Sequence, residues 1–181
     1  MFEGKMTTYI KVPIDRVGVI IGPNGNTKKI IEKKSTAKMY IDSETGSVEL
    51  SEPEDPLMAM RTGEVIKAIG RGFNPEKALR LFDDDMLTLE IMYLSNIAST
   101  PKELNRLRGR IIGKNGKSRE IFENLTGCRI SVMGKTVSIL GHTDQILIAR
   151  TGIEMLINGS PHGPVFSFLE KKRRELKENR W

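Results

Sequence analysis

The chain has 181 residues, 38% hydrophobic and 29% charged, which is the composition of a soluble globular protein with one medium domain or two small ones. A single cysteine, Cys128, excludes an internal disulfide, and with only two histidines it leaves little for a zinc site. No stretch approaches the ~18 consecutive apolar residues of a membrane span, and the first residues lack the apolar run of a signal peptide, so we expect a protein of the reducing cytoplasm.

The net charge of +6 is unevenly distributed along the chain. Residues 1–85 contain 13 basic and 14 acidic side chains, a balance of −1, whereas residues 86–181 contain 16 and 9, a balance of +7. The positive field therefore belongs to the second half. By itself this could be an ordinary solvated surface, but beside a phosphate-binding loop it would favour a polyanionic partner.

The first part of the chain predicts the order strand, helix, helix, strand, strand, helix. The expected ranges are 7–12, 14–20, 28–34, 38–42, 47–50 and 57–69. Pro13 ends the first strand, and the last two strands alternate with period two around a turn at 44–46. Asn26 and Thr27 suit the N-cap of the second helix, because their side chains can accept a bond from a free N–H group.

The second half predicts the same order again, followed by one more helix. The expected ranges are 87–94, 102–112, 117–125, 129–133, 136–140, 144–157 and 165–179. Gly127 is expected to end the helix before it. The last helix carries the basic run 171–174, which either touches RNA or is a solvated helix face.

A duplicated unit explains this recurrence. The sequence Ile20-Ile21-Gly22-Pro23-Asn24-Gly25 returns 91 residues later as Ile111-Ile112-Gly113-Lys114-Asn115-Gly116. With the loops aligned, Gly18 matches Gly109, Glu32 matches Glu123, and Lys38 matches Arg129.

We divide the chain into residues 6–70, a short helical connector at 71–85, and residues 86–181. The connector holds one expected helix at 75–82 and the acidic run 83–85. Because only ~16 residues separate the last helix of the first unit from the first strand of the second, we expect the two units to pack together.

A Gly-x-x-Gly turn between two helices, with aliphatic residues before it, resembles the loop of a KH domain. That resemblance implies an α+β fold of two tandem type I KH domains, each β-α-α-β-β-α, with an extra C-terminal helix. It also implies a function, because a KH domain clamps about four nucleotides of single-stranded nucleic acid.

The residue types in and around the loops suit this chemistry. Glycine lets the backbone approach a sugar–phosphate chain, and the N-terminus of the following helix favours a phosphate. Isoleucines before each loop would supply an aliphatic wall, and the adjoining strand could read base edges. In the first unit the candidate RNA contacts are Ile21, Gly22, Pro23, Asn24, Gly25, Asn26, Lys28 and Lys38. In the second unit they are Ile112, Gly113, Lys114, Asn115, Gly116, Lys117, Ser118, Arg119, Arg129 and Ile130.

The two loops differ in charge. Pro23 stands where the second loop has Lys114, which removes a donor and a positive charge from the first. We therefore expect the second unit to dominate RNA binding.

Other functional classes fit the sequence less well. Residues 116–118 read Gly-Lys-Ser like the end of a phosphate-binding P-loop, but that motif needs a glycine where Ile111 stands and a strand before the loop. No catalytic constellation, cofactor motif or metal site stands out, so we expect a protein that is not an enzyme. The alternative is a general RNA-binding or protein-docking scaffold.

An extended set of segments resembles one family of pre-ribosomal KH proteins, the partner of Nob one, with the KRR-type small-subunit processome protein a close relative. The segments are 72–73, 75–79, 109–117, 123–126, 137–141, 149–151 and 157–161. With two intact Gly-x-x-Gly loops, the chain is most similar to archaeal members.

This resemblance implies a non-enzymatic assembly factor that binds single-stranded RNA near the 3′ end of small-subunit ribosomal RNA and helps the endonuclease that trims it. It implies no membrane partner and no small-molecule substrate. It also places Arg108 and Arg110 beside the loop that holds RNA.

Overall fold

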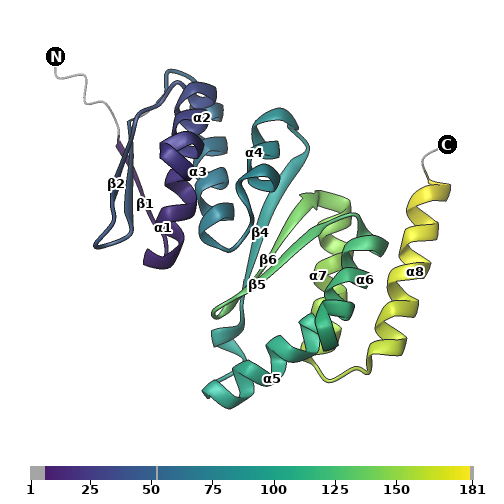
Figure 1. Cartoon of the computed structure of the whole chain (residues 1–181). Helices are drawn as coiled ribbons and strands as arrows, with labels where there is room; N and C mark the ends of the chain where they lie inside the picture. Colours follow the sequence, from purple (N-terminus) through teal and green to yellow (C-terminus); the bar gives the residue numbers. More distant parts are fainter. Residues whose placement is uncertain (1–6, 52, 180–181) are drawn as a thin grey trace. The chain divides into compact units, whose positions relative to one another are not determined.

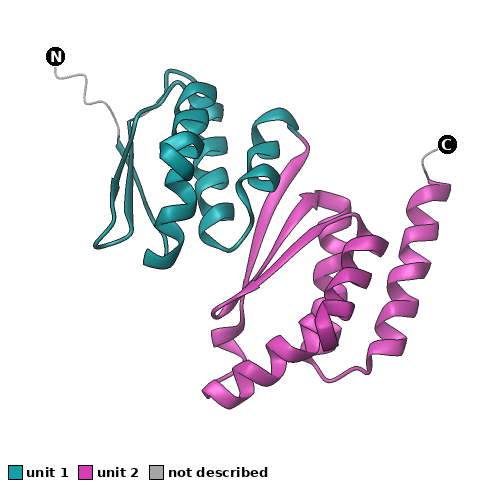
Figure 2. Cartoon of the chain, in the orientation of Figure 1, with its two compact units in different colours: residues 1–85 teal, residues 86–181 magenta. Residues whose placement is uncertain are grey.

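The computed structural model describes residues 7–51 and 53–179. The chain divides into two compact units, residues 1–85 and 86–181 (Figure 2). Each unit has one three-stranded antiparallel sheet with helices, which confirms the α+β class expected from the sequence. None of the helices within the described ranges is long and apolar enough to cross a membrane.

The first unit has the predicted order of elements. They are β1 (Thr7–Lys11), α1 (Ile14–Ile21), the 3₁₀ turn η1 (Pro23–Gly25), α2 (Asn26–Ser35), β2 (Met39–Asp42), β3 (Ser47–Ser51), α3 (Pro56–Gly70) and α4 (Pro75–Asp83). The strand order is β1-β3-β2, so the last strand of the repeat lies in the centre of the sheet.

Alternation along these strands produces one buried and one exposed sheet face. Ile10 pairs with Val48 and Met39 with Leu50, and all four side chains are buried. Helices α1, α2 and α3 cover this face (Figure 1). The apolar alternation thus fixes which side of the sheet faces the helices.

Helix α4, in the connector, packs against α3 within the first unit. Asn74 caps it by accepting a bond from the Lys77 N–H at 2.9 Å. Ala78 and Leu81 are fully buried, and Phe73, just before the helix, is 3% exposed.

The second unit repeats the arrangement and extends it. Its elements are β4 (Leu87–Tyr93), the 3₁₀ turn η2 (Leu94–Asn96), α5 (Pro101–Ile112), the 3₁₀ turn η3 (Lys114–Gly116), α6 (Lys117–Thr126), β5 (Arg129–Met133), β6 (Thr136–His142), α7 (Thr143–Ile157) and α8 (His162–Glu178). The strand order β4-β6-β5 matches that of the first sheet.

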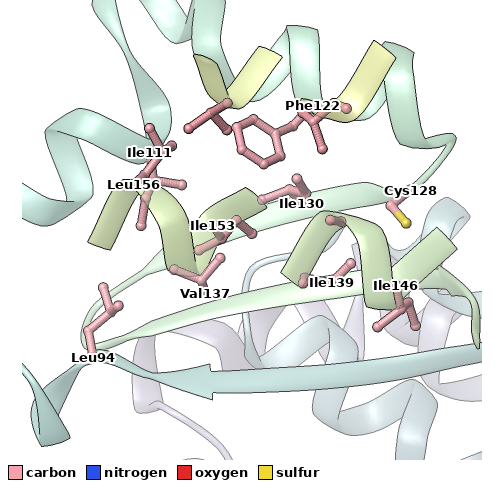
Figure 3. Close-up of a cluster of buried hydrophobic side chains, with 13 residues drawn as sticks. Leu94, Ile111, Phe122, Cys128, Ile130, Val137, Ile139, Ile146, Ile153 and Leu156 are labelled. Atoms are coloured by element: carbon pink, nitrogen blue, oxygen red, sulfur yellow. The ribbon is translucent and has the colours of Figure 1, made fainter. Parts of the chain in front are cut away.

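Aliphatic side chains from the sheet and the helices meet in the core of the second unit (Figure 3). Phe122 of α6 is fully buried, and its ring meets Phe166 of α8 edge-on at 6.3 Å. Val165 and Leu169 of α8 are also fully buried. The extra helix is therefore part of this core, packed against α6 and α7.

Three local expectations were wrong. Helix α2 begins at Asn26 with Gly25 as its N-cap and no side-chain cap, because the left-handed Gly25 already turns the chain into the helix and Thr27 is buried. Residue 94 begins a 3₁₀ turn and is not strand. Helix α8 begins at His162 instead of 165, since Pro164 lies in its first turn, where a missing N–H costs nothing. The expected stop at Gly127, with φ of 77°, is confirmed.

Candidate nucleic-acid interface

The two Gly-x-x-Gly loops have the same backbone conformation. The first glycine has φ of 74° in both, and φ is 54° at Asn24 and 55° at Asn115. The last glycine has φ of 71° in the first loop and 73° in the second. In each loop three of the four residues before the next helix therefore have positive φ, which produces a sharp turn between two helices.

The two glycines of a loop have different neighbours. A Cβ at Gly22 would lie 2.2 Å from Thr27 Oγ1, and one at Gly113 would lie 2.7 Å from Ser118 Cβ, so the first glycine has no room for a side chain. A Cβ at Gly25 would have no neighbour within 4 Å, and at Gly116 only the Arg119 guanidinium at 3.8 Å. The last glycine thus leaves the backbone open to an approaching ligand.

The isoleucines before each loop divide between the core and the surface. Ile20 and Ile111 are buried, with exposures of 0% and 1%. Ile21 and Ile112 are half-buried at the ends of α1 and α5. Only the second isoleucine of each pair can supply an aliphatic wall beside the loop.

The side chains of the second loop are exposed and basic. Lys114, Asn115, Lys117 and Arg119 are all exposed at the N-terminus of α6. Lys117 lies 3.9 Å from Glu120, but both side chains are more than half exposed, so water screens this pair. A helix N-terminus with these cations is suited to binding a phosphate group.

The two arginines expected beside this loop, Arg108 and Arg110, differ in their hydrogen bonding. Arg110 donates to the Leu156 carbonyl at 2.9 Å and to the Ser160 carbonyl at 2.5 Å, so its side chain ties α5 to the end of α7. Arg108 is half-buried, and its Nε has no hydrogen-bond partner within the described ranges.

Two of the expected contact residues turn their side chains inward. Ser118 is 3% exposed and Ile130 is 4% exposed. Their side chains are therefore not available to a ligand at the surface.

A glutamate in each unit holds the edge strand to the second helix, and the sequence reading did not assign it this role. Glu123 accepts the Ile130 N–H at 3.0 Å, and Glu32 accepts the Met39 N–H at 3.2 Å. The sequence does contain a sign of this shared role, because the two glutamates occupy the same position in the aligned repeats. Arg129 lies 3.7 Å from Glu123 and is exposed, as Lys38 is at the matching position.

The first loop has the same shape with less positive charge. Pro23, Asn24 and Asn26 are exposed, and none of them carries a charge. Lys28 is half-buried and lies 3.9 Å from Glu32. Both units therefore have the loop shape that lets an RNA backbone approach, but the exposed cations are concentrated around the loop of the second unit.

An arginine in each unit holds the end of the last helix of the repeat, a feature the sequence reading missed. Arg16 donates to the Ile69 carbonyl at 2.8 Å and the Phe73 carbonyl at 3.0 Å, as Arg110 does for Leu156 and Ser160. The two arginines occupy different positions of the aligned repeat, so alignment of the copies could not reveal them.

The described residues do not support a P-loop, a metal site or a reactive cysteine as the functional site. The residues before Gly113 form helix α5, so the strand that a P-loop requires is absent there. Within residues 7–51 and 53–179 no cluster of histidine, cysteine or carboxylate side chains could hold a metal ion. Burial raises the pKa of the Cys128 thiol to about 11, which keeps it in its unreactive protonated form.

Two family models match the chain in the order of its units. Residues 7–59 match the KH domain, and residues 88–174 match the eukaryotic type KH-domain (KH-domain type I) of the PNO1 proteins. The two matches together cover both Gly-x-x-Gly loops and every strand of both sheets apart from the first residue of β4.

Known proteins resemble the chain over most of its length. A KH domain-containing protein of Methanocaldococcus jannaschii is 42% identical over 99% of this chain and 79% of its own. The pre-rRNA-processing protein PNO1 of Saccharomyces cerevisiae is 35% identical over 78% of this chain, which spans only 53% of the yeast protein. In the solved a/eIF2alpha-aDim2p-rRNA complex from Pyrococcus horikoshii, one chain matches with a TM-score of 0.88 and 46% identity, over 96% of this chain and 97% of that one. The chain therefore belongs to the family of KH-domain proteins that includes the pre-rRNA-processing protein PNO1 and archaeal Dim2p.

Proposed function

We propose that this protein is a single-stranded RNA-binding assembly factor that acts on small-subunit ribosomal RNA near its 3′ end during ribosome maturation. It works in the cytoplasm, holds RNA without catalysing a reaction, and assists the endonuclease that trims this RNA. The observation that carries the proposal is the second Gly-x-x-Gly loop, which presents open backbone and exposed cations at one helix N-terminus.

The comparisons support this reading. Relatives of the chain are named pre-rRNA-processing proteins, and the similar Pyrococcus chain was solved in a complex with rRNA and a/eIF2alpha. A ribosomal RNA and a translation-factor subunit are therefore partner types to test for this chain as well.

The loop geometry suggests how the grip on RNA works. Gly116 admits the sugar–phosphate chain to the backbone, while Lys114, Lys117 and the α6 N-terminus attract a phosphate. Ile112, which is half-buried, provides an apolar surface for a base, and Arg129 at the start of β5 is exposed and can meet the same strand of RNA. Phosphate contacts supply affinity, and contacts to the bases select the sequence.

The first unit has the weaker site in this proposal. Its loop is formed by Gly22, Pro23, Asn24 and Gly25, Asn26 and Lys28 lie in the first turn of α2, and Lys38 directly precedes β2. Since these residues concentrate fewer cations, the first unit contributes less phosphate affinity or serves as a docking surface for a protein.

Fluorescence anisotropy of a labelled RNA matching the small-subunit rRNA 3′ end, compared with a scrambled oligomer, tests the proposal. The unmodified protein is compared with Lys114→Asp/Asn115→Asp, and Pro23→Asp/Asn24→Asp is the matched change in the first loop. We expect selective binding that the second-loop variant loses and the first-loop variant largely keeps.

The other outcomes are equally informative. Equal affinity for both RNAs would make the protein a general RNA binder without a ribosomal target. Absence of binding at low salt would favour the protein-docking scaffold. A greater loss in the first-loop variant would reverse the assignment of the main site.

A further inference from the structure

A basic hollow lies between the C-terminal halves of α6 and α8 in the second unit. It has a volume of ≈ 390 Å³ and is lined by Leu125, Glu170, Arg173, Arg174 and Lys177. A second hollow of ≈ 170 Å³ shares Leu125, Arg173 and Lys177 with it and continues over the end of α6 at Thr126 and Gly127. Figure 1 shows α6 and α8 running alongside each other at this place.

The spacing of the basic residues brings them to one face of α8. Positions 173 and 174 each lie three or four residues from both 170 and 177, so each arginine side chain is a neighbour of Glu170 and Lys177 on the helix surface. Val165 and Leu169 face the core, and Lys172 is engaged with Glu175 at 2.8 Å. The hollow therefore contains three cations and one carboxylate.

These three cations have no structural task within the described ranges. There, Arg173, Arg174 and Lys177 make neither an ion pair nor a side-chain hydrogen bond, and all three are exposed. Like charges at this spacing repel one another and weaken the helix. Their crowding in a hollow is offset if an anion binds between them.

We propose that this hollow is a second phosphate site, which holds the RNA backbone on one side of the nucleotides gripped by the Gly-x-x-Gly loop. This inference rests on the proposed function. Arginine suits the role because its planar fork can bond two phosphate oxygens at once.

The position of the hollow favours the same RNA strand over another anionic partner. Helix α6 begins at Lys117 beside the loop and reaches the hollow at Leu125, a rise of about 12 Å at 1.5 Å per residue. The start of α8 is held near the same loop, since a ring nitrogen of His162 lies 2.7 Å from the Arg110 carbonyl oxygen. Loop and hollow are therefore parts of one packed unit at a separation that a few nucleotides span.

The test uses RNAs of two lengths and two charge-neutralised variants of the whole chain. The short RNA has about four nucleotides, enough for the loop alone, and two longer RNAs of about 12 nucleotides extend it at the 5′ or the 3′ end. Arg173→Gln/Lys177→Gln removes the cations shared by both hollows. Lys135→Gln/Lys171→Gln removes the same charge from exposed positions outside the hollow.

We expect the hollow variant to bind one of the longer RNAs about tenfold more weakly at low salt, and to bind the short RNA as before. The slope of log affinity against log salt for that longer RNA should fall in magnitude by about 1.4, the value for two single-strand phosphate contacts. The control variant should match the unmodified protein, and circular dichroism of both variants should show unchanged helix content.

The inference is overturned if the hollow variant binds both longer RNAs as tightly as the control variant does. It is equally overturned if the hollow variant loses as much affinity for the short RNA as for the longer ones. It is also overturned if a hexaglutamate peptide binds in a manner that needs Arg173 and Lys177 while RNA affinity is unchanged. That result would make the hollow a docking site for an acidic protein segment. Failure of the unmodified protein to bind any of the RNAs would instead contradict the proposed function.

Discussion

At the scale of single residues, the two glycines of each loop show why the motif needs glycine twice. Gly113 is both left-handed and crowded by the backbone and side chain of Ser118, so a Cβ there is strained and has no space. Gly116 is left-handed but open. The first glycine therefore maintains the turn, and the second keeps the surface accessible.

Replacing these glycines one at a time should show how much crowding and backbone strain each contribute to the free energy of unfolding. We expect Gly113→Ala to cost about 2–4 kcal/mol, because left-handed strain adds to overpacking, and Gly116→Ala only about 1–2 kcal/mol. Urea unfolding measures both. Gly109→Ala, in the helix with nothing within 4 Å of its Cβ, is the control and should gain about 0.5–1 kcal/mol. Equal costs at 113 and 116 would show that crowding by Ser118 has no effect.

The buried thiol of Cys128 should respond to pH in a defined window. Burial raises its pKa from 9.0 to about 11, so the folded state disfavours the thiolate. The associated stability is fully present below pH 9 and is lost as pH rises toward 11. A disulfide reagent at pH 8 should modify Cys128 slowly in the folded protein and rapidly in urea. Fast modification without urea would mean that the thiol is accessible.

At the scale of elements, α8 is an integral part of the second unit. Gly152 of α7 allows this close packing, since a Cβ there would lie 2.8 Å from Phe122 Cε1 and 3.0 Å from Leu169 Cδ2. The contact joins α6, α7 and α8 at one point. The basic hollow exists only because α8 is held against α6 in this way.

We therefore expect Gly152→Ala to destabilise the second unit by about 1–3 kcal/mol, although alanine is the better helix former. Gly63→Ala in α3 is the matched control, because its Cβ would meet only Ile10 Cδ1 at an ordinary 3.5 Å. It should be neutral or stabilising. Thermal unfolding compares the two variants, and a Gly152→Ala protein as stable as the control would contradict the packing described here.

At the scale of the whole molecule, charge divides the two units more clearly than shape does. Both loops have the same backbone angles, yet residues 1–85 carry a balance of −1 and residues 86–181 a balance of +7. We therefore expect the electrostatic attraction of RNA to be concentrated on the second unit. The expected packing of the two units against each other stays a prediction.

Salt should weaken RNA binding in proportion to the phosphates contacted. About four contacts give a slope near −3 in log affinity against log salt for a single strand. Anisotropy titrations between about 50 and 200 mM salt measure this slope. A flat response would show that phosphate contacts do not supply the affinity.

The sequence by itself determined the order of the elements, the duplicated loops and the division of charge. These features depend on local patterns, namely period-two alternation in strands, helical spacing of apolar residues, and glycines where the chain must turn left-handed. The motifs that identify the family are also local in sequence, and most of them lie in the second unit.

Only the tertiary structure decided which side chains near the loops are available to RNA. Ile111 and Ile112 look alike in the sequence, but one is buried and the other is half-exposed. Arg110 was expected beside RNA, yet its guanidinium is bound to carbonyls 46 and 50 residues further along the chain. The direction of a side chain is set by partners distant in sequence, and local patterns contain no information about those partners. The same holds for the hollow between α6 and α8, whose walls come together only when the two helices pack.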